Sequence, residues 1–168
     1  MLRNDLSALD TRVTNAITGG DLVPPYTLDL SVLSYKDEIH GQNSSVTQSR
    51  MAVAADRQNG TGYVIRRFST TFTVPKKGKI KINLSRYNKD SYTTGIPITV
   101  HVYALDPSSS HESNNLLSKS IKIDGEDSLD LSSLAGRNIK VTLGMTRSGG
   151  TIYNTCGITI NSLIVTNQ

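Results

Sequence analysis

The sequence predicts an all-β fold, an antiparallel two-sheet β-sandwich, preceded by a short N-terminal α-helix. Three observations support this prediction. From Tyr26 onward apolar residues alternate with polar ones, which is the period of a strand with one buried face. Clusters of turn-forming residues separate these segments at short intervals, with no helical period between them. Before Tyr26 the apolar period is 3.5 residues instead, which indicates a helix.

Residues 1–20 carry the predicted helix, which is expected to serve assembly or docking. Its apolar residues share one side of a helix: Leu2, Leu6, Leu9, Val13 and Ala16. We expect the helix to end at Gly19 and Gly20, because glycine readily adopts the positive φ of a helix terminus. A helix of this length needs a packing partner. That partner is another copy or a docking protein in one interpretation and its own sandwich in another, and without a partner the segment would be disordered.

Residues 21–25, DLVPP, form the predicted linker, because Pro24 and Pro25 lack amide donors and cannot continue a helix. The sandwich domain is predicted over residues 26–168. Seven of its segments alternate with a period of two, namely 27–34, 69–74, 79–85, 98–105, 119–124, 138–145 and 157–166. One more strand is expected between residues 46 and 54. A step in the alternation of the last segment predicts a β-bulge near Asn161 and Ser162.

Length and composition fit one domain with wide polar faces. The chain has 168 residues, and its hydrophobic fraction of 36% is low because Ser, Thr and Asn are abundant. Cys156 is the one cysteine, so no intrachain disulfide is possible, and we expect it to be a small buried residue on a strand. No apolar run approaches the roughly 18 residues of a membrane span, so no membrane insertion is expected. Asp5 and Asp10 interrupt any signal-peptide core, which predicts synthesis in a cytoplasm.

The positive charge is concentrated in one stretch. Residues 50–89 hold ten Lys and Arg against one Asp, a net +9, and the rest of the chain sums to −5. Four of these cations form a candidate surface for an anionic partner: Lys76, Lys77, Lys79 and Lys81. Because Lys79 and Lys81 are outward members of a strand, a plain solvated face is the simpler explanation. Few aromatic residues accompany the charge, so nucleic acid is not the expected partner.

No arrangement of residues predicts catalysis, a metal or a cofactor. His40, His101 and His111 are widely separated and have no ligand spacing. The acidic residues of DGED at 124–127 lack the spacing of an EF-hand loop and are interpreted as a turn. Neither GxSxG nor a phosphate-binding glycine loop occurs. We therefore expect a protein that is not an enzyme.

Aromatic residues in a polar loop are the candidate ligand-binding site. Tyr87 and Tyr92 are grouped with Arg86 and Asp90, which supplies flat rings next to hydrogen-bonding groups, as sugar sites require. Tyr153 with Asn154 is a second choice. The sequence has no tryptophan, and half-buried tyrosines in a loop are the simpler alternative for both pairs.

The C-terminal half resembles the jelly-roll sandwiches of the galactose-binding-like and carbohydrate-binding-module group. The resemblance covers roughly residues 65–167 and includes a D-L-S-x-L-x-G segment, here Asp130, Leu131, Ser132, Leu134 and Gly136, ahead of a core strand. In that group the segment plugs one end of the sandwich and makes a turn. The resemblance therefore implies a fold, and ligand choice varies within the group.

The segment LSALDTRVTNAI resembles coiled-coil linkers of tail and fibre proteins in tailed bacteriophages. Helix, linker and small sandwich together are similar in build to the N-terminal sandwich domain of lactococcal phage receptor-binding proteins. This resemblance implies a non-enzymatic virion component of the tail tip, made in the host cytoplasm. Its implied partners are other tail proteins, a host cell-wall polymer and possible further copies of itself. The alternative functions are a stand-alone carbohydrate-binding module and an accessory domain of a separate glycan-active enzyme.

Overall fold

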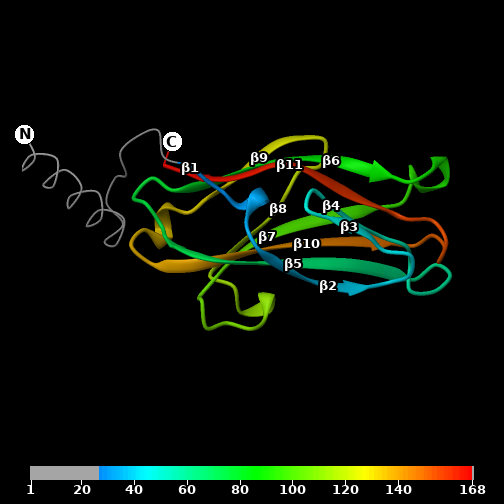
Figure 1. Cartoon of the computed structure of the whole chain (residues 1–168), viewed down its shortest axis with the longest axis horizontal. Helices are drawn as coiled ribbons and strands as arrows, with labels where there is room; N and C mark the ends of the chain where they lie inside the picture. Colours follow the sequence, from blue (N-terminus) through cyan, green and yellow to red (C-terminus); the bar gives the residue numbers. More distant parts are fainter. Residues whose placement is uncertain (1–26, 168) are drawn as a thin grey trace, which may run out of the picture.

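The computed structural model describes residues 27–167, which fold into two antiparallel β-sheets stacked face to face (Figure 1). Within this range the regular elements are eleven strands and four single 3-10 turns, η1–η4. The strands are β1 (Thr27–Asp29), β2 (Tyr35–His40), β3 (Ser45–Thr47), β4 (Arg50–Val53), β5 (Thr61–Thr73), β6 (Lys79–Asn88), β7 (Ile98–Leu105), β8 (Leu117–Ser120), β9 (Gly125–Asp130), β10 (Asn138–Ser148) and β11 (Cys156–Thr166).

The predicted fold class is wrong in its helical part. Residues 27–167 contain two antiparallel sheets, as expected, but no α-helix, and the four turns η1 (Leu30–Val32), η2 (Ser91–Thr93), η3 (Glu112–Asn114) and η4 (Ser132–Leu134) have three residues each. The apolar stripe on which the helix prediction rested lies outside the described residues. Its physical weakness is general: five spaced apolar residues do not stabilise a short helix without a surface to pack on.

The strands divide between a six-stranded and a five-stranded sheet. The six-stranded sheet has the order β3-β4-β11-β6-β9, with β1 paired to the far end of β11, and the five-stranded sheet has the order β2-β5-β10-β7-β8. The register of β11 on β6 shifts between Ile160 and Ser162, which confirms the predicted bulge. Cys156 is fully buried at the start of β11, as expected. Within residues 27–167 no helix is long and apolar enough to span a membrane.

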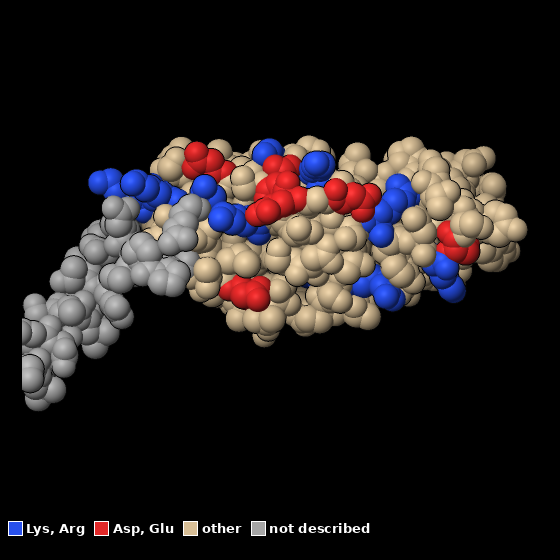
Figure 2. All heavy atoms as spheres, turned by 90° about the horizontal axis from the view of Figure 1, so that it is seen from above, with Lys and Arg blue, Asp and Glu red and all other residues tan. Residues whose placement is uncertain are grey.

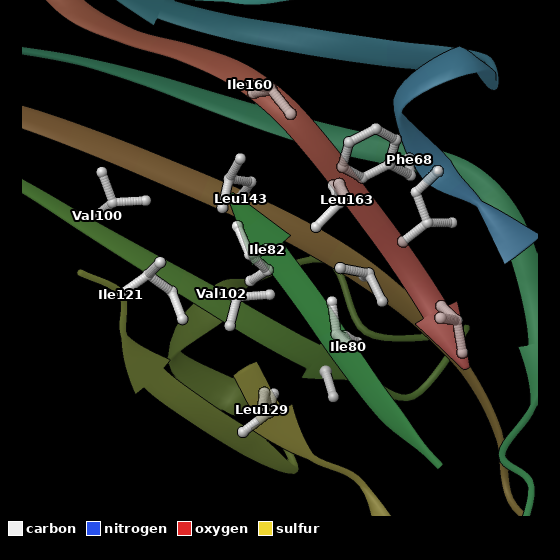
Figure 3. Packing of buried hydrophobic residues seen from close by; sticks show 14 of the residues in the cluster. Phe68, Ile80, Ile82, Val100, Val102, Ile121, Leu129, Leu143, Ile160 and Leu163 are labelled. Atoms are coloured by element: carbon white, nitrogen blue, oxygen red, sulfur yellow. The ribbon is translucent and has the colours of Figure 1, made fainter. Parts of the chain in front are cut away.

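The core lies between the two sheets and follows from the two-residue alternation. Figure 3 shows Ile80 and Ile82 of β6 pointing toward Val102 of β7 and Leu143 of β10, and all four side chains are inaccessible to solvent. Burying such side chains contributes about 1.5–3 kcal/mol each. The outer faces are left to polar residues, and loops at the sandwich ends join the sheets.

One inward position of β5 is occupied by a charge. Arg66 is fully buried, and its guanidinium donates to Asp37 of β2 (Nε to Oδ1, 2.9 Å) and to the backbone oxygens of Gln48 and Thr47 in the β3–β4 turn, both at 2.7 Å. Its Cζ atom also lies 3.7 Å from the centroid of the Tyr35 ring. Arg66 therefore links the five-stranded sheet to the edge of the other sheet.

A glycine in β11 lets the backbone of β4 approach closely. A Cβ atom at Gly157 would lie 2.0 Å from the Met51 carbonyl oxygen and 2.6 Å from Ala52 Cα, so backbone atoms of β4 would have to move. We expect Gly157→Ala to lower the free energy of unfolding by ~1–3 kcal/mol in chemical denaturation. Gly95→Ala is the control, because a Cβ there meets nothing within 4 Å. Equal stability of the two variants would contradict this account.

Stability should depend on pH through Asp127. The Lys119 ammonium, 2.8 Å from Asp127 Oδ1, and the N–H groups of Lys122 and Ser128 hold the pKa of Asp127 at about 2, below its ordinary 3.8. The ionised form is therefore favoured by folding, and its stabilising contribution is complete above about pH 4 and is lost as the pH falls to about 2. We expect Asp127→Asn to destabilise the protein at neutral pH in denaturant titrations. This difference should vanish at low pH, and a difference that is constant with pH would refute the assignment.

Candidate functional site

Two chain connections meet at one end of the sandwich, at the right in Figure 1, and enclose a pocket of about 420 Å³. Residues 89–97 join β6 to β7 and include η2, and residues 149–155 join β10 to β11. The residues that line the pocket are Tyr92, Ile96, Gly150, Thr151 and Asn154. We call it the loop-end pocket.

Asp90 couples the two connections. Its carboxylate begins η2 by accepting a hydrogen bond from Tyr92 N at 3.0 Å. The same carboxylate accepts from the lining residue Asn154, through Nδ2 at 3.3 Å. Asn154 Oδ1 in turn accepts from the Thr151 hydroxyl. The pocket therefore has a polar base whose groups are already oriented by one another, and preorganised groups lose less entropy when a ligand binds.

A buried arginine holds the second connection in place. Arg147 is the last inward side chain of β10, is fully buried, and donates to the backbone oxygens of Val53 (3.1 Å), Gly149 (2.7 Å) and Asn154. Burial lowers the pKa of its guanidinium, and the carbonyl dipoles compensate for part of the lost hydration. A side chain at Gly150 would be strained, since the residue has φ +83° and a Cβ would lie 2.3 Å from Arg147 Nη2.

Arg86 has the equivalent role in the first connection. Its Nη2 donates to the carbonyl oxygens of Thr93 (2.5 Å) and Ile96 (2.7 Å), and its Nε donates to Asn88 Oδ1 (3.0 Å). The sequence interpretation placed Arg86 among the ligand-binding residues. In the structure its guanidinium is engaged with the loop, so it shapes the pocket through the backbone that it holds.

The tyrosines separate into two groups. Tyr92 and Tyr153 are 83% and 73% exposed, and Tyr153 lies in the chain between the lining residues Thr151 and Asn154. Tyr87 points instead to the outer face of the six-stranded sheet, where the Arg50 Cζ atom lies 4.0 Å from its ring centroid. Of the predicted set, the structure brings Tyr92 and Asp90 together at the pocket and leaves Tyr87 outside it.

The predicted anionic-partner surface is interleaved with carboxylates. Lys77 and Lys79 line a shallow pocket of about 410 Å³ together with Asp130, and Lys79 and Lys81 line a neighbouring one of about 370 Å³ with Glu126 and Asp127. Figure 2, which looks onto this side, shows blue and red side chains alternating. Lys76 lies exposed in the preceding turn. Binding of an anionic partner here stays a prediction.

Sequence reasoning missed Gly150, Thr151 and Arg147, of which only Arg147 had a signal in the sequence. Gly150 and Thr151 lie in an irregular connection whose path depends on long-range backbone hydrogen bonds, such as Asn59 N to Gly150 O at 2.7 Å. Arg147 did have a signal, because it continues the inward alternation of Ile139 to Met145. A charged residue at such a position must find hydrogen-bond acceptors inside the protein.

The loop-end pocket offers hydrogen-bonding groups and an apolar contact. Its five lining residues include no carboxylate and no histidine. Within residues 27–167 no group of three or more His, Cys, Asp or Glu is placed to hold a metal ion. Exposed rings, a small apolar contact from Ile96 and amide and hydroxyl groups remain, which suit a ligand with both apolar and hydroxylated surfaces.

No family model and no curated protein matches this chain. Solved structures with a similar arrangement include the glycoside hydrolase domain of Endo-D from Streptococcus pneumoniae R6, at a TM-score of 0.47 and 15% identity, covering 85% of this chain. This chain spans 22% of the length of that one. Two others are carbohydrate-binding modules. TmCBM61, in complex with β-1,4-galactotriose, has a TM-score of 0.44 and 8% identity, covering 92% of this chain and 96% of that one. The xylan-binding module CBM15 has 0.40 and 14%, covering 84% and 95%. At such identities the likeness concerns the fold, and no residue role is transferred from these proteins.

Proposed function

We propose that this chain is a glycan-binding β-sandwich module that holds a neutral sugar in the loop-end pocket without chemical turnover. The observation that carries the proposal is the pair of exposed rings, Tyr92 and Tyr153, beside a pocket with a polar base. Exposing a large aromatic side chain to water is unfavourable. A ligand that covers the ring removes this apolar surface from water, which favours binding. Sugars present apolar C–H faces to such rings and hydroxyl edges to polar groups.

The polar base supports a neutral ligand. Asn154 and Thr151 offer amide and hydroxyl groups to a ligand's hydroxyl groups, and the Asp90 carboxylate, which is not a lining residue, lies 3.3 Å from Asn154 Nδ2. The same negative charge disfavours a ligand that carries its own carboxylate or phosphate in this pocket. Arg147 does not offset that effect for a ligand, because its guanidinium is fully buried and donates to backbone oxygens.

The predicted role in a phage tail tip stays a prediction. Nothing in residues 27–167 distinguishes a tail component from a free-standing module, because a sandwich with a binding pocket at its loop end suits either. The pocket is the same in both settings, so binding can be tested on the chain alone.

Replacing either exposed ring should weaken sugar binding. We expect Tyr92→Ala and Tyr153→Ala each to lower the affinity for neutral oligosaccharides about tenfold, which corresponds to ~1.4 kcal/mol. Isothermal titration calorimetry against a panel of neutral oligosaccharides measures this. Tyr87→Ala is the matched control, since that ring lies outside the pocket beneath Arg50. Binding should persist at high salt, because no ion pair is involved. Unchanged affinity in Tyr92→Ala, or release of a cleaved sugar, would contradict the proposal.

Two adjacent glycines test the pocket's shape. Gly149 and Gly150 have φ +87° and +83°, so alanine is strained at both, but a Cβ at Gly149 meets nothing within 4 Å. At Gly150 it would also lie 2.7 Å from Ile96 Cδ1 and displace the Arg147 guanidinium. We expect Gly149→Ala to lose ~1 kcal/mol of stability from backbone strain and to bind sugar normally. Gly150→Ala should be less stable and should lose binding, as seen by thermal unfolding and calorimetry. Equal stability and equal sugar binding of the two variants would show that backbone strain alone accounts for their effects.

A further inference from the structure

The outer face of the five-stranded sheet carries a row of side chains whose burial and contacts do not follow from strand alternation alone. The register places Lys36 of β2, Arg67 of β5, Thr142 of β10 and Tyr103 of β7 in one row across four strands. In the next row along β10 stands Gly144, and a Cβ there would be 3.4 Å from Tyr103 Cε2. The Tyr103 ring therefore reaches across the bare backbone at Gly144 and lies along the sheet. It also stacks on His101, with ring centroids 6.0 Å apart.

A segment from elsewhere in the chain crosses this row. The connection from β7 to β8, residues 106–116, projects outward beyond β5 and β10 in Figure 1 and includes η3. Its Glu112 reaches over β10 to Arg67, with Oε1 2.8 Å from Nη2 and 3.0 Å from Nε. Glu38 of β2 contacts the same Nη2 at 2.9 Å from the side. Glu112 is only 10% exposed, whereas Glu38 is 49% exposed, so Glu112 is the covered carboxylate on this face.

Thr142 lies under this crossing. It faces outward on the central strand, yet it is fully buried, and its hydroxyl has no hydrogen-bond partner among the described residues. A buried hydroxyl without a partner costs free energy, commonly about 1–3 kcal/mol. The row therefore holds an unsatisfied hydroxyl, a flat aromatic ring and an arginine in a single patch.

We propose that this patch is a second binding site, for a sugar that carries a carboxylate, such as a uronic acid, and that Glu112 occupies the carboxylate position in the free protein. The Glu112 carboxylate shows which chemical group Arg67 donates to here. When Glu112 withdraws, Lys36 and Arg67 face only Glu38, so the patch becomes complementary to an anion. The ligand carboxylate then takes the two-point contact with Arg67.

The rest of the sugar fits the rest of the patch. Withdrawal of the 106–116 segment uncovers the Tyr103 ring for an apolar sugar face and the Thr142 hydroxyl for a sugar hydroxyl. Burial and the Glu112 carboxylate together raise the pKa of the Tyr103 phenol, which agrees with a covered ring beside a negative charge. The site is independent of the loop-end pocket, whose Asp90 disfavours acidic sugars, so the two proposals fail separately.

Neutralising the internal competitor is the direct test. We expect Glu112→Gln to bind trigalacturonic acid at least tenfold more tightly than the wild-type chain in calorimetry, because the charged contact that the ligand must displace is gone. Glu38→Gln is the matched control: it removes the same charge from the same arginine but leaves the crossing segment in place, and its affinity should change less than Glu112→Gln. Arg67→Gln should abolish binding, and Tyr103→Ala should weaken it if Arg67→Gln does not fold. Galactotriose, the neutral counterpart, should respond to none of these variants.

Three outcomes would overturn the proposal. The first is equal gain in Glu112→Gln and Glu38→Gln, which would mean that only overall charge matters. The second is equally tight binding of a glutamate peptide of the same charge, which would remove the sugar from the assignment. The third is full binding by a folded Arg67→Gln variant. The pKa of the Tyr103 phenol independently tests whether Glu112 of the 106–116 segment lies beside that ring. It should move toward its ordinary value in Glu112→Gln.

Discussion

The buried guanidinium groups of Arg66 and Arg147 are the constraint on which the loop end of this sandwich depends. Both occupy inward positions of central strands in the five-stranded sheet, where the alternation otherwise supplies apolar side chains. A charge in that place is tolerated when acceptors inside the protein replace most of its lost hydration. Arg66 donates to the Asp37 carboxylate and to the backbone oxygens of Thr47 and Gln48. Arg147 donates from Nη1 and Nη2 to backbone oxygens that include that of Val53, while its Nε has no partner among the described residues. Hydrogen bonds of fixed geometry thus link the two sheets here, whereas the core holds the sheets together through buried apolar surface.

This fastening explains how irregular connections can form a defined pocket. Loops have few packing contacts of their own, so their shape has to be imposed from the scaffold. Arg147 imposes it on residues 149–155 from below, and Arg86 imposes it on residues 89–97. Asp90 and Asn154 then join the two connections directly. A pocket built in this way has exposed rings, and hydrogen bonds hold its polar groups and loop backbone in place. This arrangement favours specific binding of small polar ligands.

The sequence predicted the architecture better than the site, for physical reasons visible in single residues. Strand β7 matches its predicted bounds, since Ile98, Val100 and Val102 alternate without interruption. Strand β5 begins eight residues before its predicted start, because an arginine at an inward position hides the alternation from Thr61 to Phe68. Strand β2 was not predicted, since Asp37 at an inward position makes sense only beside Arg66, 29 residues away. The pocket depends on such distant pairs throughout, and so the sequence named Tyr92, Asp90, Tyr153 and Asn154 but neither Ile96, Gly150 nor Thr151.

The two outer faces show why polar alternation alone does not reveal function. On the six-stranded sheet, lysines and carboxylates lie side by side, Asp127 is paired with Lys119 of β8 at the edge of the other sheet, and Asn161 satisfies Asn83 and Ser85. On the five-stranded sheet, Arg67 contacts Glu38 of the neighbouring strand and also a covered carboxylate brought from a distant turn, and Thr142 is not satisfied within the described part of the chain. A solvated face needs neither a covered ion pair nor a buried unpaired hydroxyl, because water would serve both groups at no cost. Groups left in that state at the centre of a sheet face are better explained by a ligand that completes them than by solubility.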